Sequence, residues 1–323
     1  MIKTRLTESL NLKHPIIQAP MAFAAGGKLA SAVSQSGGLG LIGGAYCDAD
    51  WIDQQFKAAG NSEIGCGFIT WSLAKQPELL TNVLERKPKA IFLSFADPAP
   101  FADKIIASDA SFICQVQTLR HAKHAASCGA DIIIAQGTEA GGHGAKRATL
   151  SLVPEVADML AKDYPDTLLC AAGGIADGRG IAASLLLGAD GVLIGSRFWA
   201  SQEANVAEAM HQASIKSTGD DTIRSTVMDV ARKLDWPEGY TCRVLQNAFT
   251  DKWHDDLEGL IAVADEEAAK WREAWMQGNP VESNTFVGEA TGLINDIRPA
   301  GELLTQMSDE AEKLLTTACD YCK

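Results

Sequence analysis

The sequence lacks both a long apolar run and an excess of positive charge. None of its 323 residues belongs to an apolar stretch of the roughly 20 residues that a membrane-spanning helix needs. Lysine and arginine number 28 against 41 aspartate and glutamate residues, which gives a formal net charge of −13. Because nucleic acids and anionic membranes attract basic surfaces, we expect neither nucleic acid nor membrane as a partner.

Targeting and metal-binding patterns are also scarce. The N-terminal stretch MIKTRLTESLNLKHP lacks the apolar core of a secretory signal, so we expect a cytoplasmic protein. Cys66, Cys114 and Cys170 stand inside apolar runs, where a free cysteine packs like a small apolar residue. Cys319 and Cys322 form one CxxC pair, but a zinc site needs a second pair or nearby histidines, so we expect no metal.

Short apolar segments dominate the first 200 residues. Each segment is rich in β-branched or aromatic residues and ends in glycine or a polar residue, which is typical of strands buried on both faces of a parallel sheet. The predicted strands are 15–21, 38–44, 63–70, 90–96, 111–117, 131–137, 168–175 and 191–198. The segments between them predict helices at 28–36, 50–59, 76–87, 101–108, 119–127, 152–162 and 179–187.

Strands that alternate with helices predict an α/β protein with a parallel sheet, and eight strands close a barrel. We therefore predict a (β/α)8, or TIM, barrel with a helical insertion after the eighth strand. The competing fold is a doubly wound open sheet. The Rossmann version of that fold is disfavoured because no GxGxxG motif follows the first predicted strand.

The pattern changes after Phe198. Residues 201–290 show no convincing strand but have helical apolar spacing, clustered charge and four tryptophans, Trp236, Trp253, Trp271 and Trp275. We interpret 201–290 as a helical insertion beside the barrel mouth, and 1–200 plus 291–323 as the barrel. A helix is expected from about 299 to 317, with Pro299 suited to its first turn. Barrels of this size often pair through outer helices, which leaves a homo-oligomer open.

Glycines follow the seventh and eighth predicted strands, where barrels often build a phosphate site. Gly173 and Gly174 follow the seventh strand, and Gly195 precedes Ser196 after the eighth. Glycine lets the backbone approach a ligand so that consecutive N–H groups point at phosphate oxygens, and the Ser196 hydroxyl adds a donor. The alternative is that these glycines only form tight turns, but their paired positions favour phosphate binding.

A glycine-rich loop after the sixth strand carries a candidate catalytic residue. His143 stands in the segment AQGTEAGGHG, at the same end of the barrel, and an imidazole suits a general acid or base. Gln136, at the end of that strand, could hydrogen-bond a planar heterocycle. The alternative is a structural or merely exposed histidine. His121 and His124 lie on a predicted outer helix, where metal binding would need more ligands.

The first strand ends in QAPMA, whose proline and small residues could form a flat wall with Met21 as a soft surface for a ring system. The alternative is that these residues only pack in the core. Together with the two stretches above, this segment resembles the nitronate monooxygenase family, also called 2-nitropropane dioxygenases. The similar segments are PIIQAPM, AQGTEAGGH, AAGGIADGRGIAASLLLGADGVLIGSRF and GEATGLINDIRPAGELL, which run nearly from end to end. The resemblance implies FMN on a barrel, and oxidation of an alkyl nitronate by molecular oxygen.

The resemblance also assigns residues. His143 matches the family's catalytic base, which takes a proton from the carbon beside the nitro group or orients the nitronate. The residues that correspond to FMN contacts, mostly through the backbone, are Gln136, Gly141, Gly174, Leu193, Ile194, Gly195 and Ser196, with Met21 against the flavin. Two positions depart from the family pattern: Gly67 replaces a common asparagine, and Gly144 and Ala145 replace an arginine after the histidine.

Other functions share these features. A NAD(P)H:quinone reductase and a flavin-dependent enoyl-acyl-carrier-protein reductase have the same barrel and histidine loop but take hydride from a nicotinamide. A barrel enzyme that acts on a sugar phosphate would use the same glycine loops. A non-catalytic flavin-binding module is the non-enzyme alternative, although such a module has no need of His143 in the mouth.

Overall fold

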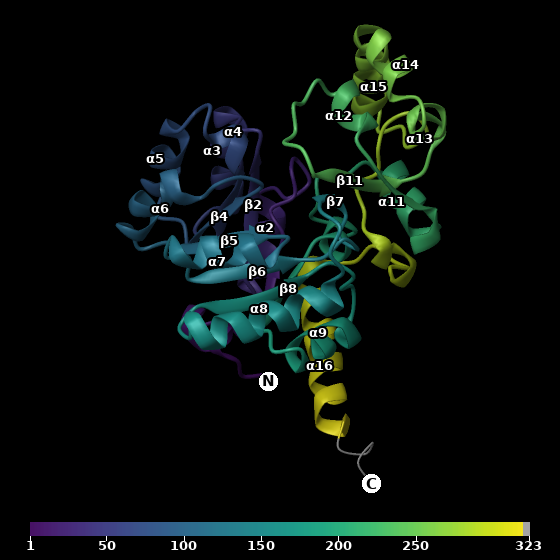
Figure 1. Cartoon of the computed structure of the whole chain (residues 1–323). Coiled ribbons are helices and arrows are strands. Elements are labelled where there is room, and N and C mark those ends of the chain that lie inside the picture. Colours follow the sequence, from purple (N-terminus) through teal and green to yellow (C-terminus); the bar gives the residue numbers. More distant parts are fainter. Residues whose placement is uncertain (319–323) are drawn as a thin grey trace.

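The short apolar segments pair in parallel around a barrel. The computed structural model describes residues 1–318, and Figure 1 shows the whole chain. The eight barrel strands are β1 Ile16–Gln18, β2 Leu41–Ala45, β3 Gly65–Ile69, β4 Ala90–Ser94, β5 Ser111–Val116, β6 Ile132–Gln136, β8 Leu168–Ala172 and β9 Gly191–Ile194. Their order is β1-β9-β8-β6-β5-β4-β3-β2, and a parallel bridge between Ile17 and Leu39 joins the two ends. The TIM barrel is confirmed, and the open doubly wound sheet is excluded.

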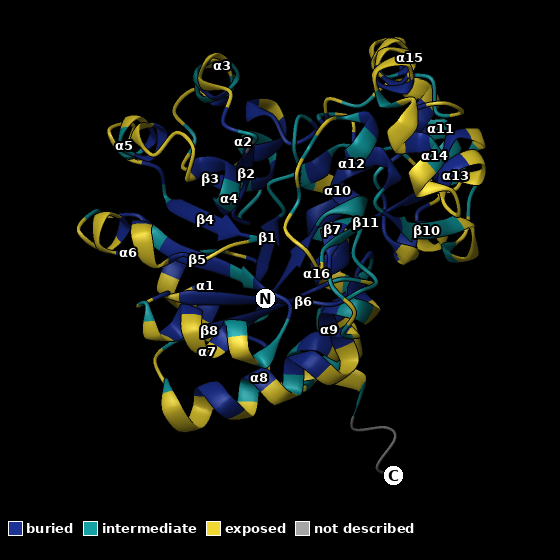
Figure 2. Cartoon of the chain, turned by 45° about the horizontal axis from the view of Figure 1, so that its top comes forward, coloured by how far each residue is buried: buried dark blue, intermediate teal, exposed yellow. Residues whose placement is uncertain are grey.

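Side chains of each strand alternate between two apolar layers, as the two-residue period of a strand requires. In β6, Ile132 and Ile134 belong to the cluster inside the barrel, whereas Ile133 and Ala135 pack in the layer between strands and helices. Figure 2 shows the strands in the buried colour and the surrounding helices exposed on their outer sides. The prediction that these strands are buried on both faces is confirmed.

Helices that follow the strands cover the outside of the barrel. They are α2 Gly27–Gln35, α3 Ala49–Ala59, α5 Glu78–Leu84, α6 Ala99–Ile106, α7 Leu119–Ser127, α8 Thr149–Asp163 and α9 Gly178–Leu186, with short helices α4 Thr70–Leu73 and α10 Ser196–Trp199 after β3 and β9. Side-chain caps begin several of them: Asp48 starts α3, Thr118 starts α7 and Asp177 starts α9. The N-terminal α1, Arg5–Leu10, contributes Leu6 and Leu10 to the interior of the barrel.

The last long helix, α16 Ala300–Thr317, returns to the barrel and packs against α9 and α2. Its buried face includes Leu303, Leu304 and Met307, so the chain after the insertion completes the outer layer of the barrel. Cys319 and Cys322 lie outside the described residues.

The segment between β9 and α16 forms the lobe at the upper right of Figure 1. It contains α11 Glu208–Ile215, α12 Val227–Ala231, α13 Ala248–Trp253, α14 Leu257–Ala262, α15 Ala264–Met276 and the 3-10 turns η1 Gly219–Asp221 and η2 Glu289–Leu293. It also contains β10 Thr222–Ser225 and β11 Thr241–Leu245, so the expectation that 201–290 has no strand is wrong. The division of the chain into a barrel, 1–200 plus 291–323, and an insertion, 201–290, stays a prediction.

These two strands attach the inserted lobe to the histidine loop. The loop residues Gly142–Gly144 form a short strand, β7, and β11 pairs with it antiparallel while β10 pairs with the other edge of β11. Cys242 of β11 lies opposite His143 in this pairing. Arginines at 224 and 243 interrupt the apolar pattern of β10 and β11, which is why the sequence did not reveal them.

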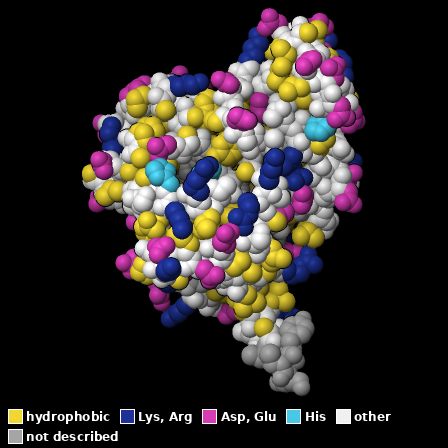
Figure 3. Space-filling model, viewed as in Figure 1, with side chains coloured by type: hydrophobic (Ala, Val, Ile, Leu, Met, Phe, Trp, Pro, Cys, Tyr) yellow, Lys and Arg dark blue, Asp and Glu magenta, His cyan; other side chains and the backbone are white. Residues whose placement is uncertain are grey.

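The surface carries charged side chains of both signs (Figure 3). In the described part of the chain, no helix is long and apolar enough to span a membrane. Figure 3 shows basic and acidic side chains on the same face, with apolar side chains between them.

Candidate active site

The carboxyl ends of the barrel strands and the inserted lobe enclose a cavity of about 650 Å³. This is the end of the barrel at which TIM-barrel enzymes place their sites. The structure brings nearly all of the predicted site residues to its wall: Met21, Gln136, Gly141, His143, Gly173, Gly174, Leu193, Gly195 and Ser196. Ile194 is the exception, since its side chain packs between the barrel and the helices, away from the cavity.

Glycines after β8 and β9 form a corner that suits an anion. Gly173 and Gly174 have φ angles of 104° and 74°, in the left-handed region that favours glycine. Among residues 1–318, no acceptor pairs with the backbone N–H groups of Gly174, Gly195 or Ser196. The Ser196 hydroxyl accepts a hydrogen bond from the N–H of Gly288 at 2.9 Å, which fixes its place. Free amides at close backbone approach fit a phosphate group.

Met21 and Gln136 flank this corner. A Cβ atom at Gly195 would lie 3.8 Å from Met21 Sδ, so the thioether lies directly beside this glycine in the cavity wall. The Gln136 side chain is held at both ends: Oε1 accepts a hydrogen bond from Gln117 at 2.8 Å, and Nε2 donates to the His143 carbonyl at 3.0 Å. Gln136 therefore fixes the histidine loop, and the residue also lines the cavity.

His143 is buried and paired with an acidic residue that the sequence did not indicate. Its Nε2 lies 3.0 Å from both carboxylate oxygens of Asp229, from α12 of the inserted lobe. The indole of Trp236 stacks on the imidazole, with ring centres 3.4 Å apart and planes 7° from parallel. In the part of the chain that the structure describes, nothing hydrogen-bonds Nδ1 of His143. With the Nε2 proton directed at Asp229, Nδ1 carries the lone pair.

Burial decides the protonation state of this histidine. Loss of solvent lowers the pKa of His143 below its usual value, and nearby Arg232 and Arg224 act in the same direction. Asp229 opposes this shift through its charge and hydrogen bond. The imidazole is therefore neutral at neutral pH and ready to accept a proton at Nδ1, while Asp229 can stabilise the imidazolium that results.

Aromatic side chains form the wall beyond His143. Trp236 makes edge-to-face contacts with three other rings. The distances between ring centres are 6.4 Å to Tyr46, 5.5 Å to Trp71 and 5.1 Å to Phe95. Phe95, directly after β4, has a φ of 64°, an uncommon conformation for a residue with a bulky side chain. Such outliers often occur at functional sites, where the surrounding packing fixes them.

Two arginines of the inserted lobe, the half-buried Arg224 and the buried Arg243, support the histidine loop. Arg224 Nε and Arg243 Nε both donate to the carbonyl of Thr138, at 3.0 and 3.1 Å. Burial lowers the pKa of Arg224 to about 10, so it stays charged at neutral pH. A Cβ atom at position 144 would come within 2.7 Å of Arg224 Nη2, so a side chain there would have to displace this guanidinium group from its hydrogen bond to the Ala140 carbonyl.

The other departure from the family pattern also has a steric cause. Gly67 of β3 lines the cavity, and a Cβ atom there would collide with the ring of Pro20 at the end of β1. An asparagine at position 67 therefore does not fit this backbone, and Pro20 occupies the space that such a side chain would need.

Positive charge collects at the outer part of the cavity. Arg232 and Arg272 line it, and the Arg232 guanidinium lies over the rings of Tyr46 and Phe286, 5.0 and 5.5 Å from their centres. Glu139 also lines the cavity, but its carboxylate accepts hydrogen bonds from Thr149. A small anion would therefore be attracted to this cavity although the chain as a whole is acidic.

Fold and site define a barrel enzyme whose mouth combines a glycine corner with free backbone amides and a neutral, carboxylate-paired histidine. Comparison with known proteins gives the family. The chain belongs to the nitronate monooxygenase family, whose model matches residues 3–62 and 71–310. The resemblance noted from the sequence is thereby confirmed, and the protein is an oxidoreductase of a flavoenzyme family.

Individual relatives agree with this assignment. A nitronate monooxygenase of Neurospora crassa is 32% identical, over 93% of this chain and 90% of its own length. The nitronate monooxygenase npaC of Metarhizium robertsii is 33% identical, over 98% of this chain and 96% of its own length. Among solved structures, FabK from Thermotoga maritima superposes with a TM-score of 0.87 and 28% identity, over 99% of this chain and 100% of FabK.

Proposed function

We propose that the protein binds FMN and oxidises alkyl nitronates with molecular oxygen. The observation that carries this proposal is the neutral, buried His143, whose Nδ1 has no partner among the described residues and whose ring lines the same cavity as the glycine corner. A proton acceptor and an anion-binding corner in one enclosed space suit a flavin that reacts with a small organic acid or its anion.

The residues present fit FMN. The single phosphate of FMN would take the free amides of Gly174, Gly195 and Ser196, and the ring system would lie near Met21 and Gln136. No positively charged side chain is required in that corner, since backbone N–H groups bind phosphate well. When bound, FMN would supply the redox chemistry by accepting electrons from the nitronate and passing them to oxygen.

The chain's own residues prepare the substrate. Nδ1 of His143 would take the proton from the carbon beside the nitro group when a neutral nitroalkane enters, and the Nδ1–H that results would donate a hydrogen bond to the nitronate that forms. Asp229 would stabilise the imidazolium, since its carboxylate already faces Nε2. Trp236 covers one face of the imidazole and keeps water from it. Arg232 at the outer cavity would attract the anionic nitronate.

Cofactor identity and oxygen uptake test this proposal together. We expect the purified protein to be yellow and to release FMN, identified by its mass, at about one equivalent per chain. We also expect preformed ethyl or propyl nitronate to start oxygen uptake in an oxygen electrode without any nicotinamide. A colourless protein, a different flavin, or uptake that requires NADH or NADPH would contradict the proposal.

A further inference from the structure

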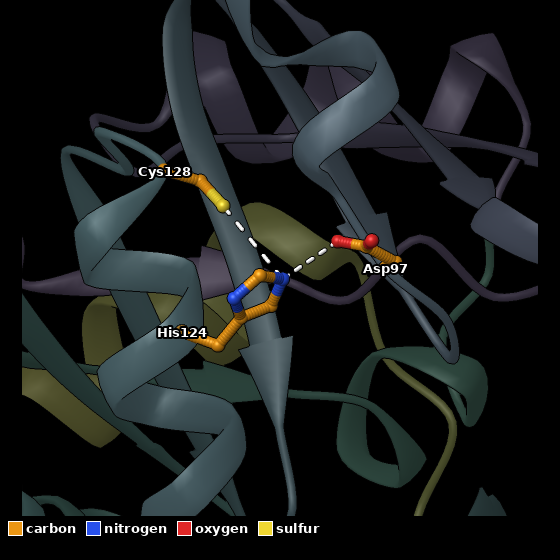
Figure 4. Close-up of side chains that lie close together, drawn as sticks. All are labelled: Asp97, His124 and Cys128. Atoms are coloured by element: carbon orange, nitrogen blue, oxygen red, sulfur yellow. Dashed lines mark hydrogen bonds and ion pairs between the residues drawn. The ribbon is translucent and has the colours of Figure 1, made fainter.

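A second cluster of metal-ligating side chains lies on the outside of the barrel. It consists of Asp97, in the loop between β4 and α6, His124 on α7, and Cys128 directly after α7. Figure 4 shows the three side chains pointing toward one another. Their ligand atoms all lie within 4.8 Å of one another, and none of the three residues lines the active-site cavity.

The local structure explains this convergence. His124 and Cys128 are four residues apart, so a helical turn places them one above the other on the same face. Asp97 reaches the pair from the neighbouring loop, where its carboxylate also accepts a hydrogen bond from the N–H of Ala99 at the start of α6. Each of the three side chains is thus anchored to a regular element.

We propose that Asp97, His124 and Cys128 form a site for a zinc-like divalent cation, with a fourth position open to solvent. Carboxylate oxygen, imidazole nitrogen and thiolate sulphur are all ligands of such ions. The ion would tie the loop after β4 to α7. On binding, the Cys128 thiol loses its proton to solvent, and carboxylate and thiolate together neutralise the two positive charges of the ion.

The distances agree with tetrahedral coordination. Bond lengths of about 2.1 Å to nitrogen and oxygen and about 2.3 Å to sulphur place neighbouring ligand atoms roughly 3.4 to 3.6 Å apart. His124 Nε2 lies 2.7 Å from Asp97 Oδ1 and 3.8 Å from Cys128 Sγ, and the carboxylate and Sγ lie within 4.8 Å of each other, so side-chain shifts on the order of 1 Å would form the site.

Exposure also agrees with this inference. The Asp97 and His124 side chains are 60% and 49% exposed, so an ion in solution can reach them. Of the six cysteines in the described part of the chain, Cys128 alone is not buried, the others being Cys47, Cys66, Cys114, Cys170 and Cys242. A cysteine that packs in the core is out of reach of an ion in solution. Cys128 is partly exposed and lies beside a histidine and a carboxylate, so an ion can reach it.

Zinc binding to the flavin-loaded protein tests the site. The reference chain carries Cys319→Ser and Cys322→Ser, so that the C-terminal cysteine pair cannot contribute. We expect this chain to bind about one Zn²⁺ in equilibrium dialysis and calorimetry, and to show a higher thermal midpoint with zinc, since an ion that binds only the folded state stabilises it. Zinc should also protect Cys128 from alkylation by iodoacetamide.

Three variants and a matched control decide the assignment. His124→Gln, Cys128→Ser and Asp97→Asn should each weaken zinc binding by at least about tenfold, because each removes one of three protein ligands. His121→Gln, on the same helix but outside the cluster, should bind zinc as the reference does. Unchanged binding in the three variants, an equal loss in His121→Gln, or no stoichiometric binding by the reference would overturn the proposal. Visible flavin absorbance shows that each variant is folded.

Discussion

Replacing His143 with glutamine is expected to lower kcat/KM for a neutral nitroalkane by about 10² to 10⁴, the usual contribution of a positioned general base. The variant should keep its flavin, because the glycine corner that would hold the phosphate does not depend on the imidazole. With a preformed nitronate the loss should be smaller, since the proton has already left the carbon. Steady-state oxygen uptake with both substrates, together with the visible flavin spectrum, measures all three outcomes.

The control for this experiment is His121→Gln, on the outer helix α7, which should leave kcat/KM unchanged. An equal loss for nitroalkane and nitronate would mean that His143 orients the substrate and does not remove the proton. A variant as active as the wild-type protein on both substrates would contradict any catalytic role for His143.

Replacing Asp229 with asparagine should reduce kcat/KM by roughly 10- to 100-fold, the factor that corresponds to about one to two pKa units of lost imidazolium stabilisation. The reason is that Asp229 alone opposes the lowering of the His143 pKa by burial and stabilises the imidazolium. Without the carboxylate, the positive form of His143 loses its counter-charge. Stopped-flow reduction of the flavin by a nitroalkane, followed across pH, measures both the rate and the pH dependence.

The pH profile separates this role from a merely structural one. The active form of His143 is neutral, so kcat/KM should fall as pH drops through its pKa, at a value below the usual 6.5. Asp229 raises that pKa, so Asp229→Asn should move the acidic limb to still lower pH. A limb that stays in place or moves upward, or a variant that simply loses its flavin, would argue against a positioning role for Asp229.

The strands of the barrel were predictable because burial on both faces gives them nearly continuous apolar sequence. β6, with its run of isoleucines at 132–134, is a clear example. β10 and β11 escaped prediction because Arg224 and Arg243 stand within them and bond to the histidine loop. The strand with which β11 pairs, β7, gave no signal either, because it is only three residues long and two of them are glycine.

The candidate site was predictable to the extent that single loops carry it. The glycines after β8 and β9 and His143 stand in short, recognisable segments, and the structure brings them to one cavity. Asp229 was not predictable, because it lies 86 residues from His143 and nothing in its sequence marks it. Trp236 belongs to the tryptophan-rich segment, which was predicted to lie beside the barrel mouth, but no pattern in that segment indicated a ring stacked on the imidazole.

The proposed cation site was not predictable from the sequence for the same reason. From the sequence, His124 had only His121 near it, and a metal site would have needed more ligands. Asp97 and Cys128 come close to His124 only once the loop after β4 lies against α7, which is a property of the fold.

Anaerobic mixing of the purified protein with an alkyl nitronate, NADH or NADPH tests the central claim most directly. The visible flavin band reports electron transfer to the cofactor before oxygen can act. We predict that the nitronate bleaches this band rapidly and that neither nicotinamide does. Rapid bleaching by a nicotinamide with no effect of the nitronate would contradict the account and identify a reductase, for which quinones and enoyl thioesters would be the acceptors to try.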